Sequence, residues 1–474
     1  QPSNCRIYPD SAYEEAGALV KEDLSEANII LGIKPVSTCD LLPNRAYFIF
    51  SHTIKAQAES MQMLDACVDR NISLFDYECI VNDDGKRVIG FGDFAGIVGT
   101  VDILQALGQR LLADGFATPF IAAPLAHMAP SLEKNILNVK ELAERIQMQG
   151  FPEGMGPIVF AVTGTGNVGR GCRRILELLP TSVVAAEDLP ALWSTPVPRH
   201  RETKIYCCYL EVHDLVRLTS QSNTASQSEF DKEHYYAHPQ EYSAVFHERI
   251  APFITVLING IYWDNRYPRL LTTSQARDLP PALSELGQRT GTPSLRAIAD
   301  ISCDLNGSLE FCSRTTTFEQ PYFEWDVRAQ RESPKVGAAV GGIVVNTVDI
   351  LPTALPQDAT DYFGRTLSPI LKDLFQSMKV NAPLPAQVER ALICHQNRLT
   401  PAFEYISRFR ETADLQDQPR QDSPEIDHPF SVVLFQGPLF ESLFVNTAFA
   451  LIRKRGVFRI LDFVVVPRKG STER

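Results

Sequence analysis

A glycine-rich turn carries the most specific chemical pattern in this sequence. It reads Gly-x-Gly-x-x-Gly, in which the first glycine permits a tight turn, the second lets a pyrophosphate approach the backbone, and the third permits close packing of a helix on a strand. An apolar run at residues 156–162 precedes it and a helical pattern follows near residues 170–179. This context favours a dinucleotide-binding loop over an ordinary strand-to-helix turn, because a helix N-terminus offers free N–H groups to phosphates. The turn consists of Gly164, Thr165, Gly166, Asn167, Val168 and Gly169.

An acidic pair follows this turn at the spacing expected for ribose recognition. Glu187 and Asp188 come about twenty residues later, after the next predicted strand. An acid in that place accepts the ribose hydroxyls and favours NAD over NADP, although the same pair also suits a solvated loop. Three arginines on the intervening helix could instead face a 2′-phosphate or form a charged helix face: Arg170, Arg173 and Arg174. The residues alone leave both cofactors open.

Titratable side chains recur at the ends of three predicted strands in the first hundred residues. The strands cover residues 28–32, 46–50 and 72–75. Carboxyl ends of parallel strands face the ligand crevice of an α/β sheet. Taken singly, a histidine or lysine after a strand is more often structural or solvated than functional, but recurrence at successive strand ends indicates a polar substrate site. The residues are Lys34, His52, Lys55 and Glu78.

The elements that must position these residues form two α/β domains. Strand and helix patterns alternate with short connections through residues 1–95, which is typical of a parallel sheet covered by helices. A predicted amphipathic helix at residues 95–113 could bridge to the second unit. That unit continues through the glycine turn to strands at residues 253–259 and 297–302. The polar segment 196–243 is predicted to be a surface insertion.

These patterns divide the chain into five predicted parts. They are an N-terminal α/β substrate domain (1–120), a dinucleotide-binding Rossmann domain (121–345), a helical return segment that packs on the first domain (346–413), a linker (414–429) and a small terminal βαβ-like piece (430–474). The chain begins with Gln1, in what reads as the interior of an α/β domain. We therefore expect the first domain to be incomplete at its start.

Composition narrows the classes of partner. The 474 residues carry a formal net charge of −12, which argues against nucleic acid and anionic membrane surfaces. The longest apolar run, near residues 336–345, is far shorter than the ~20 residues that cross a bilayer. Ten cysteines show no CxxC or zinc-type spacing. We expect free thiols, a reducing compartment, no metal and small-molecule partners.

Several sequence words resemble one known family over residues 1–410. The family is the lysine–ketoglutarate reductase portion of the bifunctional aminoadipic semialdehyde synthases, which are related to saccharopine dehydrogenases and alanine dehydrogenase. The words are LGIKP, FSHTIKAQ, DYE, FGDFAG, TGTGNVGRG, YYAHPQEY, IAPFITVLINGIYWDNRYPRLLT, ADISCDLNGSLEF and VDILPTALPQDATDYFG. YYAHPQEY and EYISRFR resemble plant-type members, and the terminal piece beginning FSVVLFQGPLF is similar to their ACT-like interdomain segment.

The resemblance implies a fold, a reaction and roles for residues. The fold is two Rossmann-like domains of the alanine dehydrogenase/saccharopine dehydrogenase type with a cleft between them. The reaction is the NADPH-dependent reductive condensation of L-lysine with 2-oxoglutarate to saccharopine, catalysed by the NADP-linked, L-lysine-forming saccharopine dehydrogenases. Lys34 and His52 match the acid–base pair, and Lys55 and Glu78 would hold substrate carboxylate and amine groups. The nicotinamide side of the crevice would be lined by Asn259, Tyr262 and Asp300.

The chemistry is consistent with such a pair. Carbinolamine formation, dehydration and imine protonation each need a proton transfer near neutral pH, a range that suits a histidine and a lysine whose pKa is lowered by neighbouring cations. For the cofactor, the resemblance implies NADPH, whereas Glu187 suggests NAD. We adopt NADPH as the expectation, since strand boundaries read from sequence err by about two to four residues.

Two departures from the family leave alternatives open. The family carries an arginine-rich word (RRE, then WERRAP) upstream of the segment where this chain begins, and a saccharopine dehydrogenase domain downstream; neither is in the given sequence. The alternatives are a catalytically silent dinucleotide-binding or regulatory module and an alanine-type dehydrogenase that accepts ammonia. The family also implies a homo-oligomer. Its plant-like words favour the cytosol over the mitochondrial matrix.

Overall fold

Three short parallel strands start the first sheet. The computed structural model describes residues 1–54, 56, 58–194, 202–219, 230–282, 284, 287 and 293–416. Strands β1, β2 and β3 pair in parallel, with Leu31 opposite Phe48 and Ile49 opposite Asp76. Two later strands, β14 and β15, extend the sheet in antiparallel fashion beside β3, which gives the order β1-β2-β3-β14-β15. The bounds are β1 Ile29–Leu31, β2 Ala46–Ile49, β3 Ser73–Asp76, β14 Leu392–His395 and β15 Arg398–Leu399.

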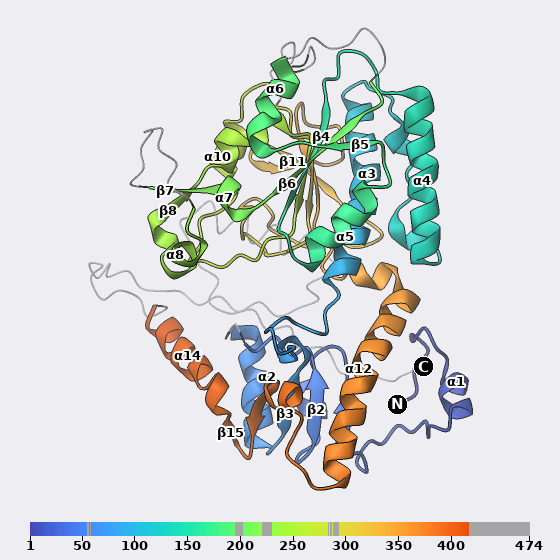
Figure 1. The fold of residues 1–474 in the computed structure, drawn as a ribbon, viewed down its shortest axis with the longest axis vertical. Coiled ribbons are helices and arrows are strands. Elements are labelled where there is room, and N and C mark those ends of the chain that lie inside the picture. Colours follow the sequence, from blue (N-terminus) through green and yellow to red (C-terminus); the bar gives the residue numbers. More distant parts are fainter. Residues whose placement is uncertain are drawn as a thin grey trace, which may run out of the picture. The chain divides into compact units, whose positions relative to one another are not determined.

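Helices close both faces of the first sheet (Figure 1). Helix α2 (Ala58–Asp69) and the start of α14 (Tyr405–Gln416) share one apolar cluster with β2 and β3. Helix α12 (Pro356–Lys379) covers the other face with an apolar stripe three and four residues apart, which is the spacing of an amphipathic helix. The stripe consists of Leu367, Ile370 and Leu374. The chain therefore returns to its first sheet after building the second.

The second sheet contains the glycine turn. Its order is β12-β11-β13-β10-β9-β4-β6-β5, and the six strands from β13 to β5 run parallel. The central strands are buried on both faces, as expected for a parallel sheet covered by helices. The bounds are β4 Ile158–Thr163, β5 Thr181–Val183, β6 Ile205–Leu210, β9 Val256–Asn259, β10 Ala297–Asp300, β11 Phe323–Asp326, β12 Arg331–Glu332 and β13 Ile343–Asn346.

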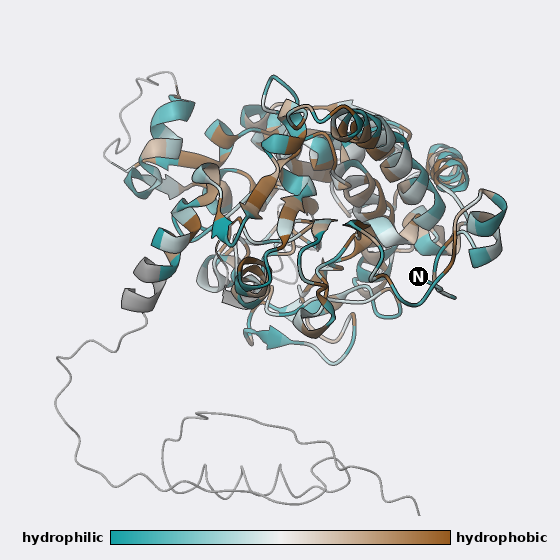
Figure 2. Ribbon diagram, turned by 90° about the horizontal axis from the view of Figure 1, so that it is seen from below, coloured by the Kyte–Doolittle hydropathy of each residue, from teal (hydrophilic) through white to brown (hydrophobic). Residues whose placement is uncertain are grey.

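Two apolar clusters, one on each face, hold the helices to this sheet. One contains α3 (Gly92–Ala113), α4 (Leu132–Gln149) and α5 (Asn167–Leu176), and the other contains α6 (Leu189–Ser194) and α10 (Thr273–Arg277). Figure 2 shows the apolar segments gathered among the packed strands and helices and the polar ones on outer surfaces. The predicted class, α/β with two Rossmann-like domains, is confirmed.

The shorter elements complete the described chain. Their bounds are α1 Asp10–Glu15, α7 Val212–Leu215, β7 Val216–Leu218, α8 Lys232–Ala237, β8 Tyr242–Ala244, α9 Phe246–Arg249 and α13 Ala386–Glu389. Strands β7 and β8 form a separate antiparallel pair. Residues 414–416 of the predicted linker (414–429) belong to the end of α14, and the rest of the linker and the ACT-like piece (430–474) lie outside the described residues. No described helix is long and apolar enough to cross a membrane.

The structure corrects the interpretation of one segment and refines that of another. The segment 196–243, predicted as a surface insertion, contains β6, which lies between β4 and β5 with Cys207 and Cys208 buried. Its strand character was masked by the polar residues on either side. Helix α3 packs along α5 and β10 in the core of the second sheet, and Phe91 at its N-cap also contacts Phe50 of the first-sheet cluster, so the helix connects the two units.

Candidate active site

The glycine turn leaves the carboxyl end of β4 as the sequence predicts. Gly164 has φ +89°, a left-handed value that favours glycine. A Cβ on Gly169 would overlap the carbonyl oxygen of Gly164, so the third glycine allows α5 to start directly on the turn. The neighbouring loop comes equally close, because a Cβ on Gly164 would lie 2.9 Å from the carbonyl oxygen of Gly260. Both loops are therefore held by backbone packing that side chains would disturb.

The start of α5 has the features of a phosphate-binding helix end. The helix has ten residues, its N-cap Gly166 forms no side-chain cap, and its first turn holds no acid. Open space surrounds Gly166, since a Cβ there would meet no atom within 4 Å. The amide groups of Asn167, Val168 and Gly169 stand in that first turn, where the helix dipole favours an anion. These residues fit the pyrophosphate of a dinucleotide.

A buried polar network joins the carboxyl ends of β4, β9 and β10. Thr163 Oγ1 donates to Asn259 Oδ1 at 2.9 Å, and Asn259 Nδ2 donates to Asp300 Oδ1 at 2.9 Å. Thr163 Oγ1 also accepts the amide of Gly260 at 3.2 Å. Burial raises the pKa of Asp300 to about 6. The network fixes the loop beside the glycine turn, so Asn259 and Asp300 lie at the predicted edge of the sheet.

Tyr262 lies in the loop that follows β9. Its side chain is exposed, and its hydroxyl donates to Asp264 Oδ2 at 3.1 Å. Because β9 is the strand next to β4, this loop adjoins the turn. Tyr262 is thus brought to the same edge as the glycines and remains accessible to a ligand there.

The strand order separates the predicted ribose acid from the glycine turn. Glu187 follows β5, which is the edge strand of this sheet in the described part of the chain. The strand beside β4 is β6, whose last residue, Leu210, is opposite Thr163. Glu211 therefore stands in the position next to the turn where a ribose-binding acid is expected. Its side chain is exposed and caps the short helix α7. The spacing rule indicated Glu187 because it assumes that strands consecutive in the sequence are also adjacent in the sheet.

The substrate residues follow three adjacent parallel strands at one edge of the first sheet. Lys34 comes after β1 and is exposed, and His52 comes after β2 and is half-buried. Glu78 comes after β3 in a short 3-10 turn. The pairing of these strands brings all three to the same carboxyl edge. Lys55, the fourth predicted residue, lies outside the described residues.

One cation near this edge was not predicted. Arg87 Nη2 lies 3.3 Å from Glu78 Oε2, and the Glu78 side chain is only 17% exposed. Arg87 follows a turn that begins after Ile80 and is itself 43% exposed, so it can reach a ligand as well as Glu78. The only sequence signal was a basic pair, Lys86-Arg87, in a polar loop, which is usually a solvated feature.

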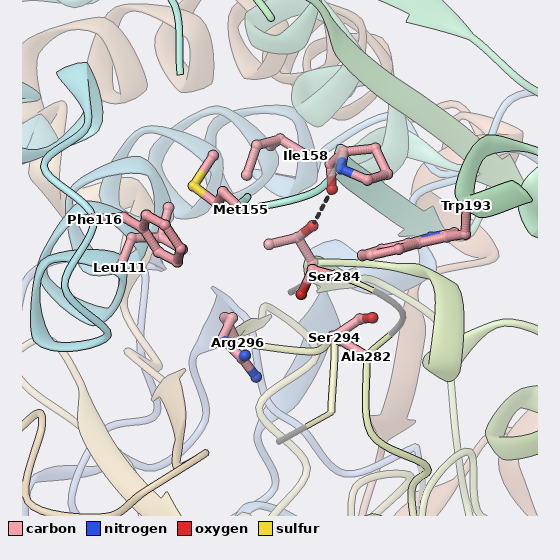
Figure 3. Close-up of a pocket in the computed structure, with 11 residues that line it drawn as sticks. Leu111, Phe116, Met155, Ile158, Trp193, Ala282, Ser284, Ser294 and Arg296 are labelled. Carbon is pink, nitrogen blue, oxygen red and sulfur yellow. Dashed lines mark hydrogen bonds between the residues drawn. The ribbon is translucent and has the colours of Figure 1, made fainter. Parts of the chain in front are cut away.

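A separate cavity lies at the opposite end of the second sheet (Figure 3). Ile158 begins β4, and Arg296 immediately precedes β10, so the cavity meets the amino ends of strands whose carboxyl ends adjoin the glycine turn. Apolar side chains, Leu111, Phe116 and Met155 among them, line much of it. We therefore exclude it from the dinucleotide site.

The described part of the chain contains neither a candidate metal site nor a disulfide bond. No three His, Cys, Asp or Glu side chains among the described residues are grouped to hold a metal ion. All ten cysteines lie in described segments and are free thiols. Burial raises the pKa of most of them, with Cys67, Cys172 and Cys207 each at about 12, so these thiols stay protonated near neutral pH.

Comparison with known proteins gives one family match and a consistent set of relatives. The family model described as alanine dehydrogenase/PNT, N-terminal domain, matches residues 1–98. α-Aminoadipic semialdehyde synthase of Arabidopsis thaliana is 38% identical over 466 residues, covering 96% of this chain and 42% of that protein. The mitochondrial α-aminoadipic semialdehyde synthase of Mus musculus is 36% identical over 425 residues, covering 87% of this chain and 44% of that protein.

A more distant relative covers most of both chains. Saccharopine dehydrogenase [NAD(+), L-lysine-forming] of Emericella nidulans is 24% identical over 385 residues, which is 78% of this chain and 82% of that protein. The chain spans less than half the length of the two semialdehyde synthases. The resemblance inferred from the motifs is confirmed: the chain is a homologue of the α-aminoadipic semialdehyde synthases over almost all of its own length and less than half of theirs.

Proposed function

We propose that this chain catalyses the NADPH-dependent reductive condensation of L-lysine with 2-oxoglutarate to saccharopine, a step of lysine degradation. The observation that carries the proposal is the 38% identity to the Arabidopsis semialdehyde synthase over 96% of this chain. The glycine turn and the three strand-end residues supply the two halves that such a reaction needs. The proposal requires that the two sheet edges face each other across a cleft in the working enzyme.

In this proposal the second sheet holds the dinucleotide, which supplies a hydride when bound. The amides of Gly166 to Gly169 and the dipole of α5 bind its pyrophosphate. Asn259, Asp300 and the exposed Tyr262 line the nicotinamide end, with the Asp300 network keeping the loop after β9 in place. Fixing this loop orients the bound ring toward the substrate, which is the way positioning lowers a reaction barrier.

Lys34 and His52 carry the proton transfers. One removes a proton from the lysine ε-ammonium so that the free amine can add to the ketone carbon of 2-oxoglutarate. The other protonates the hydroxyl of the resulting carbinolamine, which leaves as water and yields the iminium ion. Hydride addition to the iminium carbon then gives the secondary amine of saccharopine. Side chains in such roles typically contribute 10²–10⁴-fold to the rate.

Glu78, Arg87 and Lys55 bind the substrates. Glu78 suits an ammonium group, and Arg87 suits a carboxylate because its guanidinium can form paired hydrogen bonds. Their mutual contact at 3.3 Å holds both side chains at the edge before a substrate arrives. Lys55 would supply a second cation for the two carboxylates of 2-oxoglutarate. Arg87 is thus a second candidate for binding substrate carboxylates, a role for which the sequence had indicated only Lys55.

The cofactor preference is a separate part of the proposal. The resemblance supports NADPH. NADH is the second candidate, because an acid beside the turn, Glu211, disfavours a 2′-phosphate. The name of the Emericella nidulans relative also specifies NAD(+). Initial rates with each reduced cofactor distinguish the two.

The test is oxidation of the reduced cofactor, followed by absorbance, with both co-substrates and with each omitted. We expect turnover only when L-lysine and 2-oxoglutarate are both present, with saccharopine as the product identified by mass spectrometry. Equal turnover with ammonia in place of lysine would contradict the proposal and favour an alanine-type dehydrogenase. Tight cofactor binding without turnover under any condition would favour the silent binding module.

The assembly and compartment are proposals as well. We propose a homo-oligomer followed in the full protein by a saccharopine dehydrogenase domain, in line with the length of the relatives. We place it in the cytosol on its plant-like motifs, although the mouse relative is named as mitochondrial. Light scattering and imaging of the tagged full-length protein test these two points.

A further inference from the structure

A buried carboxylate, Asp76, joins the two loops that carry His52 and Glu78. Asp76 ends β3 and is fully buried. Its Oδ2 accepts the backbone amide of Ser51 at 3.1 Å and also the Ser51 hydroxyl. Its Oδ1 accepts the backbone amide of Glu78 at 2.7 Å. One oxygen of this side chain therefore binds the loop after β2, and the other binds the turn after β3.

The loop after β2 depends on this carboxylate for its shape. His52 has φ +55°, a left-handed value that is uncommon for a residue with a side chain. The residues around it are tied in series, because Thr53 Oγ1 lies 2.8 Å from Ser51 Oγ and the Thr53 amide donates to Ser51 Oγ at 3.3 Å. Backbone strain of this kind persists only where surrounding contacts hold it. Here those contacts lead through Ser51 to Asp76.

Three donors converge on a group that is costly to bury. Burial raises the pKa of Asp76, and the hydrogen bonds from Ser51 and Glu78 act in the opposite direction. An asparagine could not replace it, since an amide has a single acceptor oxygen and its NH₂ group would face a donor. A buried carboxylate that only filled space would be a poor choice beside an apolar core. This position therefore requires a side chain that accepts hydrogen bonds at both of its oxygens.

We propose that Asp76 is a positioning residue that holds His52 and Glu78 in their working geometry at the substrate edge. This role rests on the proposed function, because it assumes that His52 and Glu78 act there. Because its side chain is fully buried, Asp76 acts through its hydrogen bonds to Ser51 and to the backbone of Glu78. The sequence word DYE contains both Asp76 and Glu78, and the sequence alone does not show which of the two acids is buried.

The test compares Asp76→Asn with the matched control Tyr47→Phe. Tyr47 lies in β2 of the same sheet, is almost fully buried, and its hydroxyl accepts the backbone amide of Leu42 at 2.8 Å. Each change thus deprives a backbone amide of a buried acceptor, but the control leaves the loop after β2 untouched. We expect both to lower the melting temperature. Only Asp76→Asn should reduce kcat, by about 10²-fold, with KM for NADPH unchanged.

A second measurement separates positioning from a loss of folded protein. In the His52→Gln background, Asp76→Asn should lower kcat much less than it does in the wild type, because part of what it positions is already gone. If the two effects multiply in full, Asp76 does not act through His52. Wild-type kcat in Asp76→Asn, or a loss matched by Tyr47→Phe, would overturn the proposal.

A readout without turnover keeps this inference distinct from the proposed function. The chain has nine histidines, so selective histidine labelling gives few NMR signals, and His52→Gln identifies the one from His52. Its Cα shift reports the backbone angle. We expect the His52 signal to move in Asp76→Asn and to stay in Tyr47→Phe; an unmoved signal refutes the positioning role. Absence of lysine-dependent turnover in the wild type would refute only the function.

Discussion

Replacing either of two glycines of the same turn by alanine is expected to affect a different property. Gly169→Ala should lower stability, whereas Gly166→Ala should weaken cofactor binding. A Cβ on Gly169 would sit well inside the 3.0 Å within which real Cβ atoms are essentially never found, and the atom in its way is the backbone oxygen of Gly164. The carbonyl carbon of Gly164 is 3.1 Å away, so the peptide itself must shift. By contrast, Gly166 has φ −78° and open space around it. Alanine at position 166 therefore fits the protein without ligand.

The magnitudes follow from these two environments. Overpacking typically costs about 1–3 kcal/mol, and the gain in helix propensity on replacing glycine returns only about 1 kcal/mol. Because a backbone carbonyl obstructs it, Gly169→Ala belongs at the upper end of that range. Gly166→Ala should change stability by less than about 1 kcal/mol. Its Cβ instead occupies the surface a pyrophosphate must approach, and a 10–100-fold weaker affinity corresponds to about 1.4–2.7 kcal/mol.

The assay is a pair of titrations on both variants and the wild type. Urea unfolding followed by circular dichroism reports stability, and NADPH fluorescence reports binding. We expect Gly169→Ala to unfold at lower urea and Gly166→Ala to unfold with the wild type while binding NADPH weakly. Wild-type affinity in Gly166→Ala would refute the turn as a phosphate site. Wild-type stability in Gly169→Ala would refute the packing argument.

Three further predictions concern single side chains. Lys34→Met and His52→Gln should each lower turnover about 10²–10⁴-fold while leaving NADPH affinity unchanged in fluorescence titrations; unchanged rates in both would leave the motif a structural role. Glu211→Ala should raise the ratio of NADPH to NADH efficiency in steady-state rates and Glu187→Ala should not, the reverse pattern arguing against the strand-order interpretation. Burial raises the pKa of Asp102 from 3.8 to about 7, so between about pH 4 and pH 7 the folded chain binds a proton that the unfolded chain does not, and this group's contribution to stability falls as pH rises. Asp102→Asn should therefore gain in melting temperature relative to the wild type between pH 5 and pH 8, and a constant difference would show that Asp102 is ionised throughout.

Local patterns predicted the elements of the site well. The strand before the glycine turn and the helix after it were read from hydrophobic periodicity and three glycines, because both depend on residues close in sequence. The helical return segment predicted at residues 346–413 contains α12, Pro356–Lys379. The three strand ends that carry Lys34, His52 and Glu78 were found in the same way. Their roles in catalysis stay predictions.

Pairing between distant segments was beyond the same reasoning. Nothing local in Ile205–Leu210 states that it lies between β4 and β5, since strand order is decided by packing across the whole sheet. Glu187 was predicted for that reason, and Glu211 was not considered. Likewise, Asp76 and Glu78 are both acids two residues apart, and only the fold shows that one is fully buried. Arg87 became a candidate only through its contact with Glu78.

The late return of β14 to β3 has a consequence for how the protein is made. The two strands pair antiparallel, with Leu392 opposite Phe75, although more than 300 residues separate them. A ribosome adding about 5–20 residues per second needs roughly 15–60 s to cover that distance. During this interval the flank of β3 is open, and the second sheet can be completed first. Chaperone binding during translation should therefore be strongest before residue 392 emerges, and ribosome profiling of chaperone-bound chains can detect it.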